Sequence, residues 1–133
     1  ELRDRRNLAI LFISHNLALV GSIADRIIVM YAGLALESGP VEEVLHRPRH
    51  PYTRALLDSL LRPDDHYTAG RLTTIPGVVP DPLGSEPGCP FAPRCAFVTP
   101  ACRQAVPPLA ADADAVPGHR HRCVLPGVKK GAR

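Results

Sequence analysis

The sequence predicts an α/β domain that lacks its front part and is followed by a small, proline-rich, cysteine-containing irregular module. Short apolar runs alternate with segments of helical periodicity over residues 1–61. Eleven of the 15 prolines and all four cysteines lie from Pro76 onward, so the two halves of the chain differ in kind. A chain of 133 residues has room for one modest domain with an appended module.

The first predicted elements are a strand and a helix. Leu8–Ile13 is an unbroken apolar run, which is typical of a strand covered on both faces in a parallel sheet. Asn16 is placed to cap a helix that follows. The apolar face of this helix is expected at Leu17, Val20 and Ile23 or Ala24.

Two further strands and two helices complete the pattern. Ile27–Met30 is a second candidate for a buried strand, and a shorter strand is expected at Leu34–Glu37. Pro40 and Pro51 stand at natural first positions of helices, and Pro48 ends the first of these helices. Two central strands need more sheet to bury both faces, so we expect a fragment of a larger domain; the chain opens at Glu1 without an initiator Met.

The domain organisation is predicted as four parts. Residues 1–61 form the α/β part, 62–70 a polar linker that contains His66, 71–126 the cysteine module and 127–133 a basic, disordered tail. No apolar run is long enough to cross a bilayer and no signal peptide opens the chain, so a cytosolic protein with reduced cysteines is expected. The net charge of +3 is too small to indicate nucleic-acid binding.

The four cysteines are the candidate metal ligands. Cys89, Cys95, Cys102 and Cys123 are separated by 5, 6 and 20 residues. Four thiolates hold either a tetrahedral zinc ion or an iron–sulfur cluster. The clustering of the cysteines favours ligation, and the absence of close C-x-x-C pairs leaves the identity of the metal open. Two disulfides or four free thiols are the alternatives, and the first would require an exported protein.

Basic side chains surround these cysteines in the sequence. A four-thiolate site carries negative charge, which nearby guanidinium groups would offset while donating hydrogen bonds to sulfur. The arginines expected to do so are Arg94, Arg103, Arg120 and Arg122. His119 and His121 stand in the same segment.

His15 follows the first predicted strand and precedes a helix. Ligands of open α/β sheets bind at the carboxyl ends of strands, so this histidine could orient a phosphate or a water molecule. The alternative is a structural histidine in a turn. His46 and His50 flank Pro48 and are expected to shape the junction between two helices rather than bind metal.

Several stretches, in the same order, resemble the ATPase subunits of ABC transporters. Leu11–Leu17 is similar to the switch-histidine loop of that family, and Ala24–Gly33 is similar to the segment after it. The resemblance continues through Glu37–Pro40, Glu43–Leu45 and Ile75–Gly77. His50–Leu57 and the cysteine block of Gly88–Cys123 resemble the branch that imports oligopeptides, dipeptides or nickel.

The resemblance implies the C-terminal part of a P-loop ABC ATPase domain, in which His15 senses the γ-phosphate of ATP and helps to hold the attacking water. The phosphate loop, the signature motif, the magnesium-holding Asp and the catalytic Glu are all missing from the sequence. ATP with Mg²⁺ therefore needs residues outside this chain, and this fragment alone is predicted to be inactive.

For the cysteine block, the resemblance implies a [4Fe-4S] cluster with a structural or regulatory role, held by Cys89, Cys95, Cys102 and Cys123. Zinc is the alternative. His119 and His121 are then neighbours of the site rather than ligands, although either could replace a cysteine around zinc.

The predicted function is that of an ATP-binding, energy-coupling subunit of an importer for di- or oligopeptides or related cargo. The implied partners are a second ATP-binding subunit, transmembrane permeases and, indirectly, a substrate-binding protein, at the cytoplasmic side of the bacterial inner membrane. The main alternative is a stand-alone metal-binding or redox module, folded from about Arg71 onward. A zinc-stapled nucleic-acid binder is disfavoured by the low charge and the few aromatic residues near the cysteines.

Overall fold

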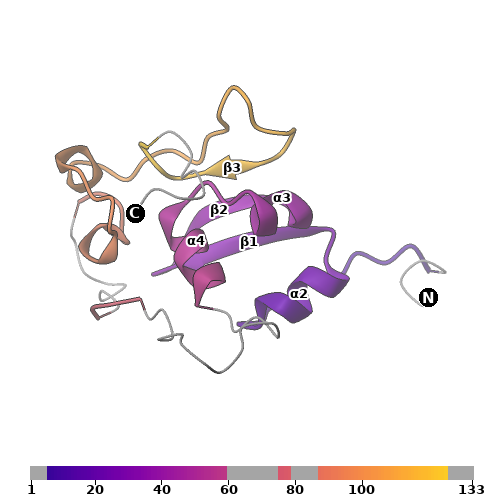
Figure 1. Ribbon diagram of the computed structural model, residues 1–133. Coiled ribbons are helices and arrows are strands. Elements are labelled where there is room, and N and C mark those ends of the chain that lie inside the picture. Colours follow the sequence, from indigo (N-terminus) through magenta and orange to yellow (C-terminus); the bar gives the residue numbers. More distant parts are fainter. Residues whose placement is uncertain (1–5, 60–74, 79–86, 126–133) are drawn as a thin grey trace.

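A computed structural model of the chain describes residues 6–59, 75–78 and 87–125 (Figure 1). The predicted linker at 62–70, with His66, and the predicted basic tail at 127–133 lie outside the described residues. The described part combines helices with a three-stranded sheet of order β1-β2-β3. None of its helices is long and apolar enough to cross a membrane.

The sheet is antiparallel. Strands β1 (Arg26–Tyr31) and β2 (Leu34–Pro40) form a hairpin, and β3 (Arg120–His121) pairs with β2. The hairpin loop consists of two residues, Ala32 at φ +46° and Gly33 at φ +80°. Two consecutive positive φ angles are the mark of a type I′ turn, whose twist matches that of the paired strands.

The hairpin contains a β-bulge. Val29 pairs with Glu37 and Met30 pairs with Ala35, so Leu36 is the extra residue of β2. An extra residue breaks the alternation of side chains along a strand. As a result, Leu36 and Glu37 are adjacent in sequence and both are fully buried.

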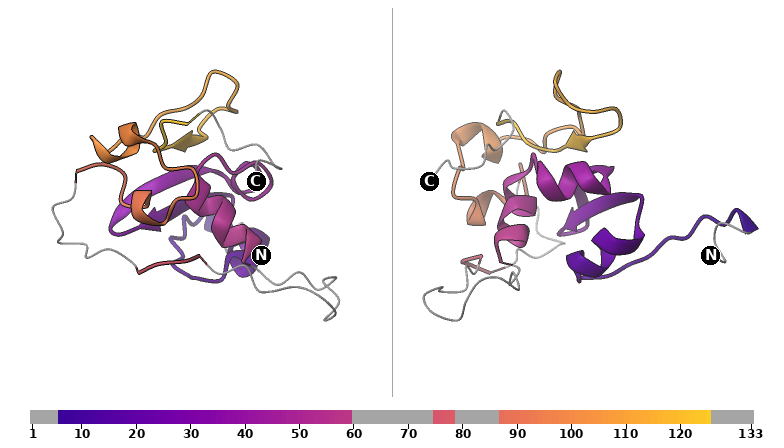
Figure 2. Two further views of the ribbon diagram at one scale, coloured as in Figure 1. Left: turned by 60° about the vertical axis from the view of Figure 1, so that its left-hand side comes forward. Right: turned by 45° about the vertical axis from the view of Figure 1, so that its right-hand side comes forward.

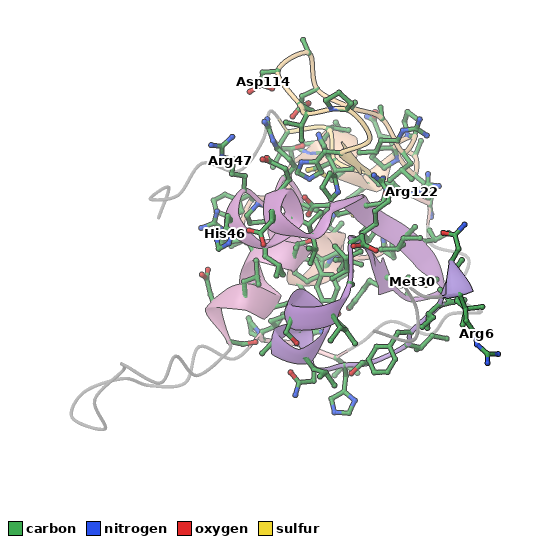
Figure 3. All side chains as sticks on the ribbon, turned by 90° about the vertical axis from the view of Figure 1, so that its right-hand side faces the viewer. Arg6, Met30, His46, Arg47, Asp114 and Arg122 are labelled. Atoms are coloured by element: carbon green, nitrogen blue, oxygen red, sulfur yellow. The ribbon has the colours of Figure 1, made fainter. Side chains whose placement is uncertain are left out.

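The expected parallel sheet is not formed by the described residues. Residues 8–13 have no regular secondary structure, are exposed, and extend away from the rest of the chain (Figure 1). β1 is buried on one face only, with Ile28 62% and Met30 58% exposed, and Figure 3 shows Met30 on the side of the sheet away from His46. An apolar strand is stable only beside partner strands, and the described residues give residues 8–13 none.

The three predicted helices are confirmed. Helix α2 (Leu17–Ile23) is capped by Asn16, whose Oδ1 accepts a hydrogen bond from the Leu19 amide at 3.1 Å. Helix α3 (Val41–His46) leaves β2 directly after Pro40, and helix α4 (Pro51–Asp58) begins with proline at its first position.

The core consists of two apolar clusters. The first joins α2, β1 and α3 through Val20, Ile27, Val29 and Val44. The second joins the hairpin to the C-terminal segment, because Phe91 packs with Tyr31 and Leu36. The ring centroid of Phe91 lies 5.5 Å from that of Tyr31 and 5.2 Å from that of Tyr52 on α4.

The C-terminal segment, residues 87–125, has little regular structure. It contains two 3-10 helices, η1 (Ala92–Arg94) and η2 (Pro100–Arg103), and then β3. Figure 2 shows η1 and η2 gathered at the end of the hairpin beside α4. An irregular path was predicted here, and the existence of a separate module with the boundaries 71–126 stays a prediction.

Candidate cysteine site

The four predicted ligands lie around one cavity. Cys89, Cys95, Cys102 and Cys123 line one partly open cavity, together with His50 and Phe91. We refer to this space as the four-thiol cavity. All four cysteines are free thiols in the structure.

Local backbone geometry brings these cysteines together. The Cys89 amide donates to the carbonyl of Cys102 at 2.8 Å, which ties the first cysteine to the third. Gly88 precedes this contact at φ +105°, and a Cβ at that position would lie 2.5 Å from the same carbonyl oxygen. Only glycine fits so close an approach with that backbone conformation.

Burial favours the neutral form of three of these thiols, those of Cys89, Cys95 and Cys123. Burial raises the pKa of Cys89 and Cys95, and it raises the pKa of Cys123 to about 11. Neighbouring thiols raise these values further because two thiolates side by side repel each other. A cation bound among the thiols would offset both the burial of thiolate charge and the repulsion between thiolates. The thiols would then release protons.

The described residues form no ready-made site for a single metal ion. A structural zinc ion needs four ligands at about 2.0–2.3 Å in a tetrahedron. In the described part of the chain, no three His, Cys, Asp or Glu side chains are grouped to hold a metal ion. The donor set is therefore that of a thiol-lined cavity and not of a preformed zinc site.

His50 projects into this cavity from the start of α4 and is 1% exposed. Its Nδ1 accepts a hydrogen bond from the Tyr52 amide at 3.1 Å and so caps the helix. Its Nε2 lies 3.9 Å from Cys89 Sγ. Burial lowers the pKa of His50 to about 4, so the ring is neutral at physiological pH.

Glu37 lies behind His50 and connects three segments. Its Oε1 accepts from the Arg49 amide at 2.7 Å and its Oε2 from the His50 amide at 3.0 Å. The same Oε1 lies 2.7 Å from His119 Nε2, and both side chains are buried. One carboxylate of β2 therefore holds the start of α4 and the C-terminal segment at once.

The arginines near the cysteines do not take the predicted role. Arg94 donates to the carbonyls of Ile75 and Pro76 and to the Tyr31 hydroxyl at 2.8–3.1 Å. Arg122, labelled in Figure 3, lines the cavity, yet it donates to the carbonyls of Ala35 and Pro107 at 2.8 and 2.9 Å. Arg103 and Arg120 are exposed, and no arginine of the described residues donates to sulfur. Backbone carbonyls use these donors instead.

The predicted histidines lie in different places. His15 is exposed in the turn before α2 and does not line the four-thiol cavity. His119 contacts Glu37, and His121 Nε2 lies 3.1 Å from Asp112 Oδ1, so neither lines the cavity. The cavity histidine is His50, which the sequence interpretation assigned only to the helix junction.

The sequence interpretation missed Glu37 as well. An acidic residue at the end of a short strand is expected to be exposed to solvent. The bulge at Leu36 instead places the side chain of Glu37 on the buried side. The available signal for His50 was its position directly before Pro51, which is an N-cap position.

Comparison with known proteins gives a consistent result. A family model described as the C-terminal region of oligopeptide/dipeptide transporters matches residues 36–102. A putative peptide import ATP-binding protein of Brucella ovis is 47% identical over 128 residues, which covers 93% of this chain and 37% of the relative. One of Brucella melitensis is 50% identical over 114 residues, 83% of this chain and 34% of the relative. The chain thus spans about a third of the length of the relatives it matches.

Proposed function

Because the chain belongs to the family of oligopeptide/dipeptide transporter C-terminal regions, we propose that it is the C-terminal part of an ATP-binding subunit of an ABC-type peptide importer. The observation that carries the proposal is the match to proteins named for ATP binding in peptide import, over 93% of the chain. The full-length subunit would hydrolyse ATP, while this chain lacks the phosphate loop and the catalytic Glu and would be inactive alone.

The alternative of a stand-alone metal-binding or redox module is not supported. The family match begins in β2 and ends at Cys102, so it includes parts of both halves of the chain. The contacts of Glu37 with the start of α4 and with His119 join the same two halves. A module folding from about Arg71 onward would leave these buried groups without partners.

His15 would act at the γ-phosphate of ATP in the full-length subunit. His15 is exposed before α2, and Asn16 caps that helix, so the imidazole is accessible to a nucleotide bound by other parts of the full-length protein. An imidazole there donates a hydrogen bond to a phosphate oxygen or orients the attacking water.

The four cysteines would hold a [4Fe-4S] cluster, with zinc as the alternative. The supporting observation is the donor set, since all four thiols line one cavity. Cys89, Cys95, Cys102 and Cys123 would each supply one thiolate. A bound cluster would crosslink the C-terminal segment and could exchange an electron, which suits a structural or regulatory role.

The partners follow from the proposed subunit type. A second ATP-binding subunit would form a dimer around the nucleotide, and transmembrane permeases would dock on that dimer. A substrate-binding protein would deliver the cargo to the permeases. The subunit would then be peripheral to the cytoplasmic side of the bacterial inner membrane.

ATP turnover by the full-length subunit tests the proposed function. We expect His15→Ala to lower turnover by about 100-fold or more, the usual contribution of a positioned acid–base group, with nucleotide binding retained. His46→Ala is the matched control, because His46 is a surface histidine whose side chain is 74% exposed. Turnover by His15→Ala equal to that of the control would contradict the role of His15.

Metal analysis tests the proposed cluster. Protein purified without oxygen should contain iron and sulfide in equal amounts, with a visible absorption band that Cys95→Ser abolishes. Zinc alone would support the alternative metal. Absence of all three elements would exclude ligation, and the importer assignment would then depend on the family match alone.

A further inference from the structure

The tautomer of His50 is set by its helix-capping role. Its Nδ1 accepts the Tyr52 amide hydrogen at 3.1 Å, so Nδ1 carries no proton. In a neutral imidazole the proton then resides on Nε2. The nitrogen that points to the cysteines is therefore a hydrogen-bond donor.

The position of this donor is fixed from two sides. The His50 amide donates to Glu37 Oε2 at 3.0 Å, which holds the backbone. The ring is 1% exposed and its centroid lies 6.2 Å from that of Phe91. Its Nε2 lies 3.9 Å from Cys89 Sγ, within reach of a sulfur acceptor, and the backbone carbonyl of Arg122 is a second acceptor near the ring.

We propose that His50 is a positioning residue of the cysteine site, whose Nε2–H donates to Cys89 Sγ. A ligand role for His50 does not fit, because the nitrogen facing the cavity carries the proton. Of the arginines predicted to donate to sulfur, two donate to backbone carbonyls and two are exposed, so His50 takes their place. The first experiment below depends on the proposed cluster, whereas the second needs only the metal-free chain.

The first experiment measures the reduction potential of the iron-loaded protein. His50→Asn separates the two roles of the residue, because Asn is a good N-cap and yet cannot reach Cys89. Loss of a hydrogen bond to sulfur lowers the potential of a cluster. We expect unchanged iron content and a lower potential, by an amount equivalent to about tenfold in the reduced-to-oxidised ratio, or ~59 mV for one electron.

A control variant and two possible results for His50→Asn decide whether the proposal holds. His46→Asn removes an exposed histidine and should leave the potential unchanged. A potential for His50→Asn equal to that of wild type would overturn the proposal. Loss of iron from His50→Asn, with the amide spectrum of a folded protein, would also overturn it, since that result identifies a ligand.

The second experiment uses the metal-free chain labelled with ¹⁵N at histidine. We expect the nitrogen resonances of His50 to report the Nε2–H tautomer, and Cys89→Ala to shift the Nε2 resonance. An Nδ1–H tautomer, or no response to Cys89→Ala, would overturn the proposal whatever metal the protein binds. If the loaded protein contains no iron, the cluster fails while this result still decides the role of His50.

Discussion

Helices α2 and α3 on one hand and the C-terminal segment on the other pack against the hairpin through different kinds of contact. Helices α2 and α3 pack on β1 through aliphatic side chains, with Val44 fully buried among them. The C-terminal segment contributes one large apolar side chain, Phe91, to a shared cluster. Cys89 and Cys95 pack against the same cluster, and the polar contacts of the segment with the hairpin include the hydrogen bonds of Arg122 and His119.

This difference predicts different responses to substitution. Apolar burial is non-directional and scales with the area removed from water. A buried hydrogen bond needs both partners, and removal of one leaves the other unsatisfied. The C-terminal segment should therefore depend on a few named atoms, of which the Glu37 carboxylate is the most connected.

The largest effect is expected for Glu37→Ala. The substitution leaves the amides of Arg49 and His50 and the ring of His119 without their buried acceptor. We expect the free energy of unfolding of the chain to fall by about 3–5 kcal/mol, as for other broken buried charged groups. Urea denaturation followed by circular dichroism measures this change.

Two further variants serve as comparisons for Glu37→Ala. Glu37→Gln keeps one acceptor oxygen and should lose less stability than Glu37→Ala. Glu42→Ala removes a glutamate whose side chain is 78% exposed and should change stability little. Equal stability of the Ala variants at 37 and 42 would contradict the connecting role of Glu37.

The next effect tests the apolar half. Ile27→Ala empties part of the first cluster, and we expect a loss of roughly 2–4 kcal/mol from lost burial and the remaining cavity. Ile28→Ala is the matched control, because the neighbouring side chain lies on the exposed face of β1. A similar loss for both variants would show that the two faces of β1 are buried alike.

The sequence predicted the helices well because their signals are local. Asn16 caps α2 and Pro51 begins α4 as expected, and each needs only a few neighbouring residues to act. The cysteines were identified as one group from their clustering in the sequence. The four cysteines line one cavity, and their role as ligands stays a prediction.

What the sequence did not predict depends on distant partners. The buried state of Glu37 depends on the bulge at Leu36 and on His119, which is far away in the chain. The apolar run at residues 8–13 has strand composition, yet strand formation requires a neighbour that the described residues do not provide. Arg122 was predicted to donate a hydrogen bond to sulfur, because nothing in the sequence indicates to which carbonyl oxygens its guanidinium group donates.

A smaller and more local effect is expected for Arg122→Met. The substitution keeps an unbranched apolar side chain like the aliphatic part of Arg122 and removes its donors to the carbonyls of Ala35 and Pro107. We expect a loss of about 1–3 kcal/mol, because charged donors make the stronger protein hydrogen bonds. Hydrogen exchange should speed up at the His121 amide, which bonds to Ala110, before it does in the β1–β2 pairing.

Arg120→Met controls for the loss of a positive charge. Arg120 is exposed and adjacent to the strand residue His121, so its removal should leave exchange unchanged. Equal acceleration in the hairpin and in the C-terminal segment of Arg122→Met would mean that the two halves open as one unit.

The smallest effect is expected for Asp114→Asn, and salt distinguishes it from the others. Asp114, which Figure 3 shows in the loop before β3, accepts from both terminal nitrogens of Arg49 at 3.0 and 3.2 Å, but its side chain is 75% exposed. An exposed ion pair contributes about 0.5–1 kcal/mol at low salt. At about 1 M salt the screening length is roughly 3 Å, so the difference from wild type should nearly vanish. The Arg122→Met difference should persist, because carbonyl acceptors carry no net charge. An Asp114→Asn effect as insensitive to salt as that of Arg122→Met would place the Arg49 contact among the buried polar contacts that hold the C-terminal segment.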